Sequence, residues 1–168
     1  MEEQDLKENA AKMIVEAVDF ASMAGLTASD CGISLSTSLY LNIRDAMFHF
    51  KALCDSTDPD NRLRHYFNLK EHLLRGEKDA VICQVHSLCD AIHEIMQQKD
   101  FHKIFKQEET KQLQVLVHDM KDVVLRLRIE GADLHSDAAF SVLDAWQAVK
   151  VYTDQVVRLC RSKNILLF

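Results

Sequence analysis

The sequence has little of what a fold built from strands and tight turns requires. It contains only four glycines and one proline in 168 residues, whereas Ala, Leu, Glu, Gln, Lys and Met recur throughout. Strand connections depend on glycine and proline, and the recurrent residues are good helix formers. No internal repeat or low-complexity linker divides the chain. We therefore predict an all-α fold, a single helical-bundle domain of five to six helices over residues 1–168.

Long apolar runs are also absent, because no stretch approaches the roughly 18 residues that span a bilayer. The first residues, Met1-Glu-Glu-Gln-Asp, are acidic, whereas a signal peptide begins with basic residues. These features predict a cytoplasmic protein without membrane contact. The five cysteines form no paired framework, which predicts reduced and mostly buried thiols. They are Cys31, Cys54, Cys83, Cys89 and Cys160.

Two further absences reduce the number of possible functions. The chain has neither a glycine loop that would cradle phosphates nor a dinucleotide fingerprint, so we expect no cofactor and no ordinary nucleotide-dependent chemistry. The formal net charge is −6, which opposes broad nonspecific coating of nucleic acid, because such binding neutralises phosphates. Any RNA site must then be a local basic patch.

Apolar residues recur at intervals of three and four along most of the chain, which is typical of amphipathic helices. Asp58 is a predicted N-cap with Pro59 as the first helical residue, and Gly25 and Gly131 are predicted helix ends. Gly76 either ends a helix or bends a longer one, and both alternatives stay open. The expected helices cover about residues 4–24, 35–53, 59–75, 76–98 and 113–127, with a last helix capped by Ser136 in which Val142, Leu143, Trp146, Val149 and Val156 face inward.

What the chain does contain is a group suited to chemistry in the helix of residues 35–53. Arg44 offers up to five fixed donors to a phosphate, and His49 can move protons near neutral pH. Asp45 precedes His49 by four residues, on the same helix face, and is expected to orient the imidazole or to stabilise its charge. A plain amphipathic helix, with a solvated Arg44–Asp45 pair and His49 at the core boundary, explains the same residues.

The segment Arg44-Asp45-Ala-Met-Phe-His49 resembles the motif of the HEPN superfamily. That family comprises helical bundles of about this size, whose catalytic members carry Arg, a polar residue, three further residues and then His. The motif covers six residues, whereas the bundle class covers nearly the whole chain. Relatives paired with a nucleotidyltransferase antitoxin often carry a tyrosine two residues after the histidine, and Lys51 stands at that position here.

The resemblance implies a homodimer with a composite site that cuts single-stranded RNA without a metal. On this model, Arg44, Asp45 and His49 are catalytic: the ribose 2′-hydroxyl attacks the adjacent phosphodiester, His49 transfers protons, and Arg44 stabilises the developing charge. Catalytic relatives act as toxins or in phage defence, some with an antitoxin as protein partner. Other members have lost activity and only bind, so a noncatalytic interaction or regulatory module is the alternative.

A basic run downstream of the motif is a candidate path for RNA. Arg62, Arg64 and Lys70 could contact phosphates, and Tyr66 could stack on a base. Glu71, Glu77 and Asp79 interrupt the positive charge. A solvated helix face explains this run as well.

A second alternative is a metal-binding bundle, suggested by a polar stripe in the next helical segment. The stripe comprises Asp79, Cys83, His86, Asp90, His93 and Gln97. Imidazoles and carboxylates at helical spacing suit Zn or Fe, but a metal site within a bundle takes inward ligands from several helices. No Glu-x-x-His pair or Cys-x-x-Cys motif supports such a site. We therefore name no metal ligand, and solvent exposure is the simpler explanation of the stripe.

Overall fold

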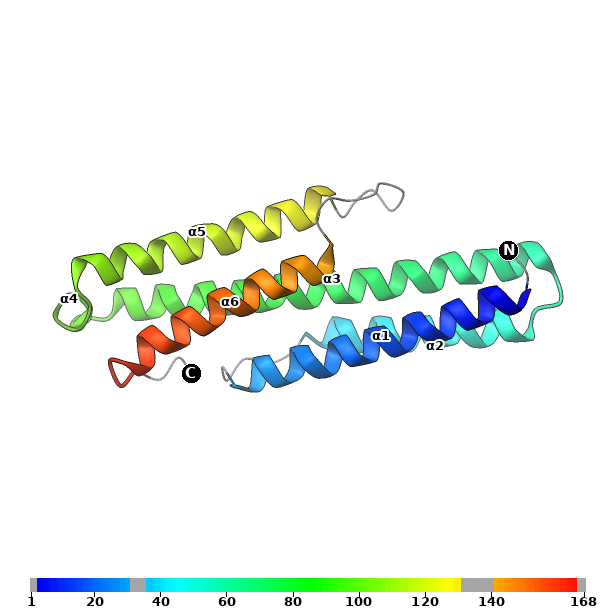
Figure 1. Ribbon diagram of the computed structural model, residues 1–168, viewed down its shortest axis with the longest axis horizontal. Coiled ribbons are helices and arrows are strands. Elements are labelled where there is room, and N and C mark those ends of the chain that lie inside the picture. Colours follow the sequence, from blue (N-terminus) through cyan, green and yellow to red (C-terminus); the bar gives the residue numbers. More distant parts are fainter. Residues whose placement is uncertain (1–2, 31–35, 131–140, 166–168) are drawn as a thin grey trace. The chain divides into compact units, whose positions relative to one another are not determined.

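A computed structural model describes residues 3–30, 36–130 and 141–165, and within these ranges it contains six helices and no strand. The all-α prediction is therefore confirmed. No helix in the described ranges combines the length and the apolar character that crossing a membrane requires. The helices are α1 (Glu3–Asp30), α2 (Thr37–Asp55), α3 (Pro59–Gln97), α4 (Phe101–Ile104), α5 (Gln107–Glu130) and α6 (Val142–Arg161), shown in Figure 1.

The contacts of the chain group into two compact units, which are described separately below. The first unit comprises Met1–Leu26 and Leu35–Ala80, and the second comprises Thr27–Ser34 and Val81–Phe168. The prediction of one domain over residues 1–168 accordingly stays a prediction.

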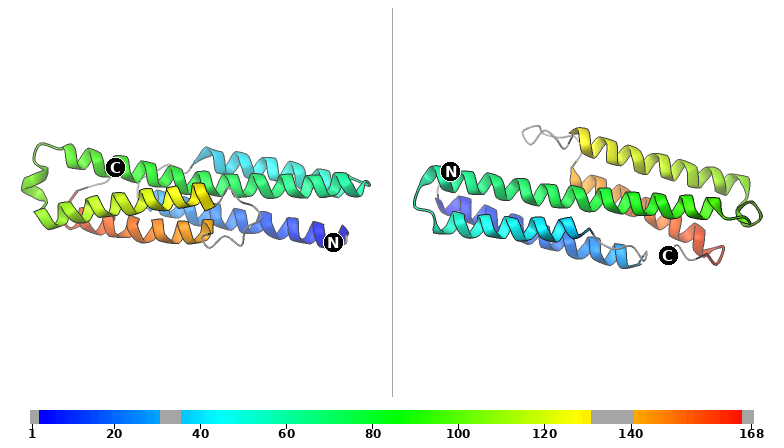
Figure 2. Two further views of the ribbon diagram at one scale, coloured as in Figure 1. Left: turned by 90° about the horizontal axis from the view of Figure 1, so that it is seen from above. Right: turned by 180° about the vertical axis from the view of Figure 1, so that it is seen from behind.

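The first unit consists of most of α1, all of α2 and the N-terminal half of α3. Within it, α2 runs antiparallel to α3 (Figures 1 and 2). Arg62 at the start of α3 forms an ion pair with Glu3 at the start of α1. Small and aliphatic side chains fill the interior between the three helices: Leu6, Ala10 and Ala17 of α1, Leu39, Ala46 and Leu53 of α2, and Leu69, Leu73 and Ala80 of α3 are all buried.

The second unit consists of the C-terminal half of α3 with α4, α5 and α6. α5 and α6 pack against each other, and Lys163 after α6 bonds Glu109 of α5 at 2.7 Å. Ser141 caps α6, because its hydroxyl accepts from the Asp144 N–H while Asp144 accepts from the Ser141 N–H. The predicted cap Ser136 lies outside the described residues. Interior side chains include Leu88, Ile92, Phe101, Leu113, Met120, Trp146, Val149 and Val156.

Two glycines lie inside helices. Gly25 lies inside α1, which continues to Asp30, so the expected helix end at this residue is wrong. Of the two alternatives for Gly76, the longer helix is confirmed, because α3 runs unbroken from Pro59 to Gln97. The predicted start at Pro59 is confirmed, with the Asp58 carboxylate accepting from the Asp60 N–H at 3.2 Å. Gly131 lies outside the described residues.

Two side-chain predictions also need correction. Leu143 is 51% exposed, because at about 100° per residue it lies off the face of α6 that carries the buried Ala145, Trp146 and Val149. The cysteines are free thiols wherever the chain is described. Cys89 and Cys160 are buried as predicted, and burial raises the pKa of Cys160 to about 11. Cys54 is exposed instead, and Cys31 lies outside the described residues.

Candidate functional site

A row of polar side chains on α2 meets a second polar row on α3 within the first unit. On α2 the spacing from Ser38 is four, seven and eleven residues, which keeps Ser38, Asn42, Asp45 and His49 on one face. We call the contact between the two rows the α2–α3 seam. It is formed by Ser38, Asn42 and His49 of α2 and by His65, His72, Gly76 and Asp79 of α3.

Gly76 lets the two helices approach each other at the seam. A Cβ atom added at Gly76 would lie 2.8 Å from the Cβ of Asn42 and 3.3 Å from the carbonyl oxygen of Leu39. Both atoms belong to or adjoin the α2 backbone, so a side chain at Gly76 would push the helices apart. This close approach brings short polar side chains on α2 within reach of α3.

A chain of hydrogen bonds runs through the seam from Asp79 to His72. The Ser38 hydroxyl donates to the Asp79 carboxylate at 2.6 Å, and the Asn42 amide donates to the Ser38 carbonyl at 2.9 Å and to the Ser38 hydroxyl at 3.2 Å. The Asn42 carbonyl oxygen then accepts from Nδ1 of His72 at 3.2 Å. Since an amide oxygen only accepts, His72 carries its proton on Nδ1. The chain thereby fixes the tautomer of one histidine.

His49 lies at the other end of the seam, between two histidines of α3. Its Nδ1 is 3.0 Å from Nδ1 of His65, and its ring stacks on His72 with centroids 5.3 Å apart. Two imidazole nitrogens at this separation share one proton, with one ring donating and the other accepting. When His49 donates from Nδ1, its Nε2 carries a free lone pair. His49 and His65 are both half-buried rather than sealed in the core.

The surroundings of His49 favour its neutral form. Burial lowers the pKa of His49 below its ordinary value of 6.5, and repulsion by the neighbouring imidazoles of His72 and His65 lowers it further. Asp45 opposes this shift, whereas Arg64 adds to it. A histidine with a lowered pKa is unprotonated at neutral pH and can accept a proton.

Arg44 and Asp45 pair with each other rather than with the histidine. The Asp45 carboxylate accepts from Nη2 of Arg44 at 2.7 Å and from Nε at 3.0 Å. The bond to Arg44 lowers the pKa of Asp45, so the carboxyl stays ionised. His49 is hydrogen-bonded to His65, and Asp45 acts on His49 through its charge. The Arg44 side chain remains 70% exposed.

The four residues predicted to contact RNA lie in four different environments. Arg64 is exposed and lies close enough to His49 to affect its pKa. Arg62 is 13% exposed in its ion pair with Glu3. Tyr66 is 8% exposed, and Lys70 is half-buried with its Nζ 5.9 Å from the Tyr66 ring centroid. Of the predicted set, Arg64 alone presents its charge freely beside the seam, and Tyr66 belongs to the core.

The structure gives no support to a metal centre. Among the described residues, no group of three or more His, Cys, Asp or Glu side chains has an arrangement that could hold a metal ion. In the polar stripe on α3, His86, Asp90 and His93 are exposed, as the simpler explanation predicts.

The seam was not predicted as a site, although the sequence carries a signal for it. His65, His72, Asp79, His86 and His93 follow one another at intervals of seven residues along α3. Residues seven positions apart lie nearly above one another on a helix, with a drift of about 20° for each seven residues, so these side chains form one row. The matching row on α2 has a different spacing, so pairing the two rows required the antiparallel register that the structure supplies.

Comparisons with known proteins do not assign the chain to a family. No protein-family model, no curated protein and no solved structure matches it. The class that the structure defines is therefore an all-α protein with a histidine cluster between two antiparallel helices. Any functional assignment rests on the chemistry of that cluster.

Proposed function

We propose that the protein is a metal-independent endoribonuclease, similar in its motif to the HEPN superfamily, that cleaves single-stranded RNA at the α2–α3 seam. The observation that carries the proposal is the 3.0 Å contact between Nδ1 of His49 and Nδ1 of His65. It holds a histidine of lowered pKa in an orientation that leaves Nε2 available to a substrate. The exposed guanidinium of Arg44 lies on the same helix.

The reaction begins when Nε2 of His49 takes the proton of the ribose 2′-hydroxyl. The 2′-oxygen attacks phosphorus, the bond to the 5′-oxygen breaks, and the leaving oxygen takes up a proton. His65 acts as a positioning residue, because it accepts from Nδ1 of His49 and stabilises the imidazolium that forms. The products are a 2′,3′-cyclic phosphate and a 5′-hydroxyl, and no metal or redox partner is needed.

The charges beside the seam suit an RNA backbone. Arg44 is exposed, and its bond to Asp45 uses Nε and one terminal nitrogen, which leaves further N–H donors for a phosphate. Arg64 adds a second exposed cation near His49. Two cations bind a phosphodiester locally despite the negative net charge of the chain.

A homodimer through α2 would complete this site. The outward face of α2 carries Arg44 among large exposed apolar side chains: Tyr40, Leu41, Met47 and Phe48 are 54%, 46%, 56% and 67% exposed. Apolar side chains gathered on one helix face are typical of an interface. In a two-fold dimer, the two copies of Arg44 and His49 would share one cleft, where one His49 takes the 2′-proton and water supplies the proton for the leaving oxygen. Toxin or phage-defence activity, with an antitoxin as partner, would fit such an enzyme.

The cleavage proposal is tested with pure protein, single-stranded RNA and excess EDTA. We expect cleavage with cyclic phosphate ends, and a loss of about 10²- to 10⁴-fold in both Arg44→Ala and His49→Ala. His118→Ala and Arg158→Ala are the matched controls, since both residues are exposed and lie in the second unit. Cleavage that EDTA abolishes, or full activity in both site variants, overturns the proposal.

The same apolar face favours a second candidate function, a noncatalytic module that binds a protein through α2. Met47→Asp separates the two functions, because Met47 is an exposed apolar side chain of the same face, whereas the Phe48 ring contacts the ring of His49. An enzyme that acts as a dimer loses both its dimer mass in light scattering and its RNA cleavage. A noncatalytic binding module cleaves no RNA, either as the wild type or as the variant. In that case the substitution removes only the binding of the protein partner.

A further inference from the structure

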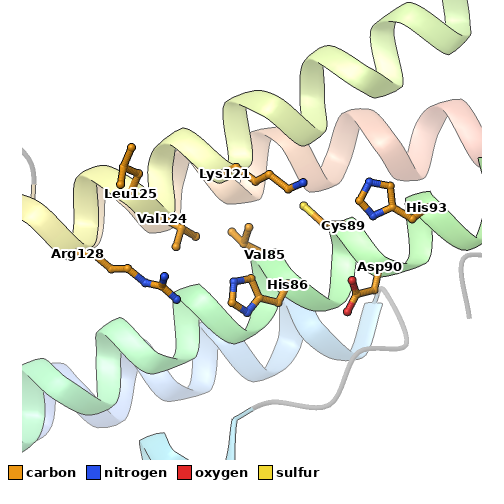
Figure 3. Close-up of a pocket in the computed structure, with 9 residues that line it drawn as sticks. All are labelled: Val85, His86, Cys89, Asp90, His93, Lys121, Val124, Leu125 and Arg128. Atoms are coloured by element: carbon orange, nitrogen blue, oxygen red, sulfur yellow. The ribbon is translucent and has the colours of Figure 1, made fainter.

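A hollow between α3 and α5 in the second unit has the features of a binding site for a small organic anion. We call it the α3–α5 depression; its volume is about 380 Å³, within the range of about 300–1,000 Å³ typical of small-molecule sites. Nine residues line it: Val85, His86, Cys89, Asp90 and His93 of α3, and Lys121, Val124, Leu125 and Arg128 of α5 (Figure 3).

The polar groups of the depression lie at its two ends. Lys121 and Arg128 are seven residues apart on α5, as are His86 and His93 on α3, which corresponds to about 10 Å along each helix. The two helices run antiparallel, so the pairs match: Figure 3 shows Arg128 directed toward His86, and Lys121 directed toward His93. Each end thus combines one fixed cation with one imidazole.

Between these ends the wall is formed by the apolar side chains of Val85, Val124 and Leu125 and by the thiol of Cys89. Neither Lys121 nor Arg128 forms an ion pair with another described residue. Asp90, which is the acidic member of the nine lining residues, points away from α5 in Figure 3. The depression therefore presents unneutralised positive charge at both ends of an apolar centre.

We propose that the α3–α5 depression binds a small organic molecule with a phosphate at each end of an apolar or aromatic centre. A guanidinium binds phosphate through two parallel N–H donors, and an imidazole adds a third donor. The phosphate at the Arg128 end is bound in this way by Arg128 and His86. The second phosphate meets the Lys121 ammonium group and His93. The valine and leucine side chains contact the centre of the ligand.

Calorimetric titration with 1,4-phenylene bisphosphate, phenyl phosphate and hydroquinone tests this proposal on the full chain. We expect the bisphosphate to bind more tightly than the monophosphate, and hydroquinone to bind least. Arg128→Ala and Lys121→Ala should each weaken bisphosphate binding by roughly tenfold or more, because each substitution removes the charged group that binds one phosphate. Lys111→Ala is the matched control, because Lys111 lies on α5 outside the depression and is exposed.

Three results would overturn the proposal. The first is the absence of binding by any of the three probes at millimolar concentration. The second is equal affinity for the bisphosphate and for hydroquinone, which would show that the charged ends contribute nothing. The third is unchanged affinity in both single variants. Because both replaced side chains are exposed, thermal unfolding should match the wild type and exclude misfolding as a cause.

Discussion

The histidines of α3 have two different environments, although they belong to one row with a spacing of seven residues. In the first unit, His65 and His72 contact the polar side of α2 and are hydrogen-bonded to His49 and Asn42. In the second unit, His86 and His93 are exposed and line a depression beside α5.

The difference shows that the helix opposite each histidine decides what the histidine can do. α2 presents a row of polar side chains and approaches α3 closely at Gly76, so His65 and His72 of α3 form hydrogen bonds with side chains of α2. α5 offers cations and aliphatic side chains around open space, so the imidazoles there remain available to a ligand. The seam is suited to proton transfer, and the depression to binding.

The largest effect on stability should come from a charge that the first unit buries on α3. Burial raises the pKa of Glu77 from 4.5 to about 7, and repulsion from Glu16 contributes to the shift. The folded state holds this proton more tightly than the unfolded state, so stability is full below pH 4.5 and falls as the pH rises through 7. Glu77→Gln should remove this fall and stabilise the protein by about 3 kcal/mol at pH 8.

Urea unfolding at several pH values measures the effect of Glu77. Glu71→Gln is the control, because Glu71 lies on the same helix and is exposed. The prediction would be contradicted if the stability of the Glu77→Gln variant fell between pH 4.5 and 7 as steeply as that of the wild type.

Removing one side chain from each region tests the comparison itself. Asn42→Ala removes the hydrogen bonds to Ser38 and His72 and leaves their partners unsatisfied in a half-buried seam. It should destabilise the protein by about 2 kcal/mol. His86→Ala, in the exposed depression, should change stability by less than about 0.5 kcal/mol. Equal losses in the two variants, measured by urea unfolding, would show that the two regions do not differ in this way.

A smaller loss than that of Asn42→Ala is expected from a change at the close approach of α2 and α3. Gly76→Ala gains about 1 kcal/mol of helix propensity, but its Cβ would clash with Asn42, and overpacking costs about 1–3 kcal/mol. We expect a net loss of about 1 kcal/mol in thermal or urea unfolding. Gly25→Ala, inside α1, gains the same helix propensity and serves as the comparison. A more stable Gly76→Ala variant would contradict the tight seam.

The sequence was sufficient to predict those parts of the fold that depend on local patterns. The scarcity of glycine and proline predicted helices, and Asp58 with Pro59 predicted where α3 begins. Glycine misled the prediction at Gly25 and left it open at Gly76, because a glycine inside a helix can serve packing rather than termination. Only the tertiary contact between α2 and α3 reveals which role Gly76 has.

The candidate site was predictable only in part for a similar reason. Arg44, Asp45 and His49 lie in one short segment, so their proximity could be inferred from helix geometry. The partner of His49 could not be inferred in this way, because His65 is 16 residues away in the sequence and contacts His49 only through the antiparallel packing of two helices. Likewise, the burial of Tyr66 depends on the packing of the first unit rather than on its basic neighbours.

Rescue of a His49 variant by free imidazole tests the central claim most directly. His49→Ala leaves space at the half-buried seam, and the measurement is RNA cleavage in EDTA as imidazole is added. We predict that wild-type protein cleaves RNA, that His49→Ala does not, and that imidazole restores part of the activity while His65 is present. A wild-type protein that cleaves no RNA in EDTA, or a His49→Ala variant as active as the wild type without imidazole, would contradict the claim.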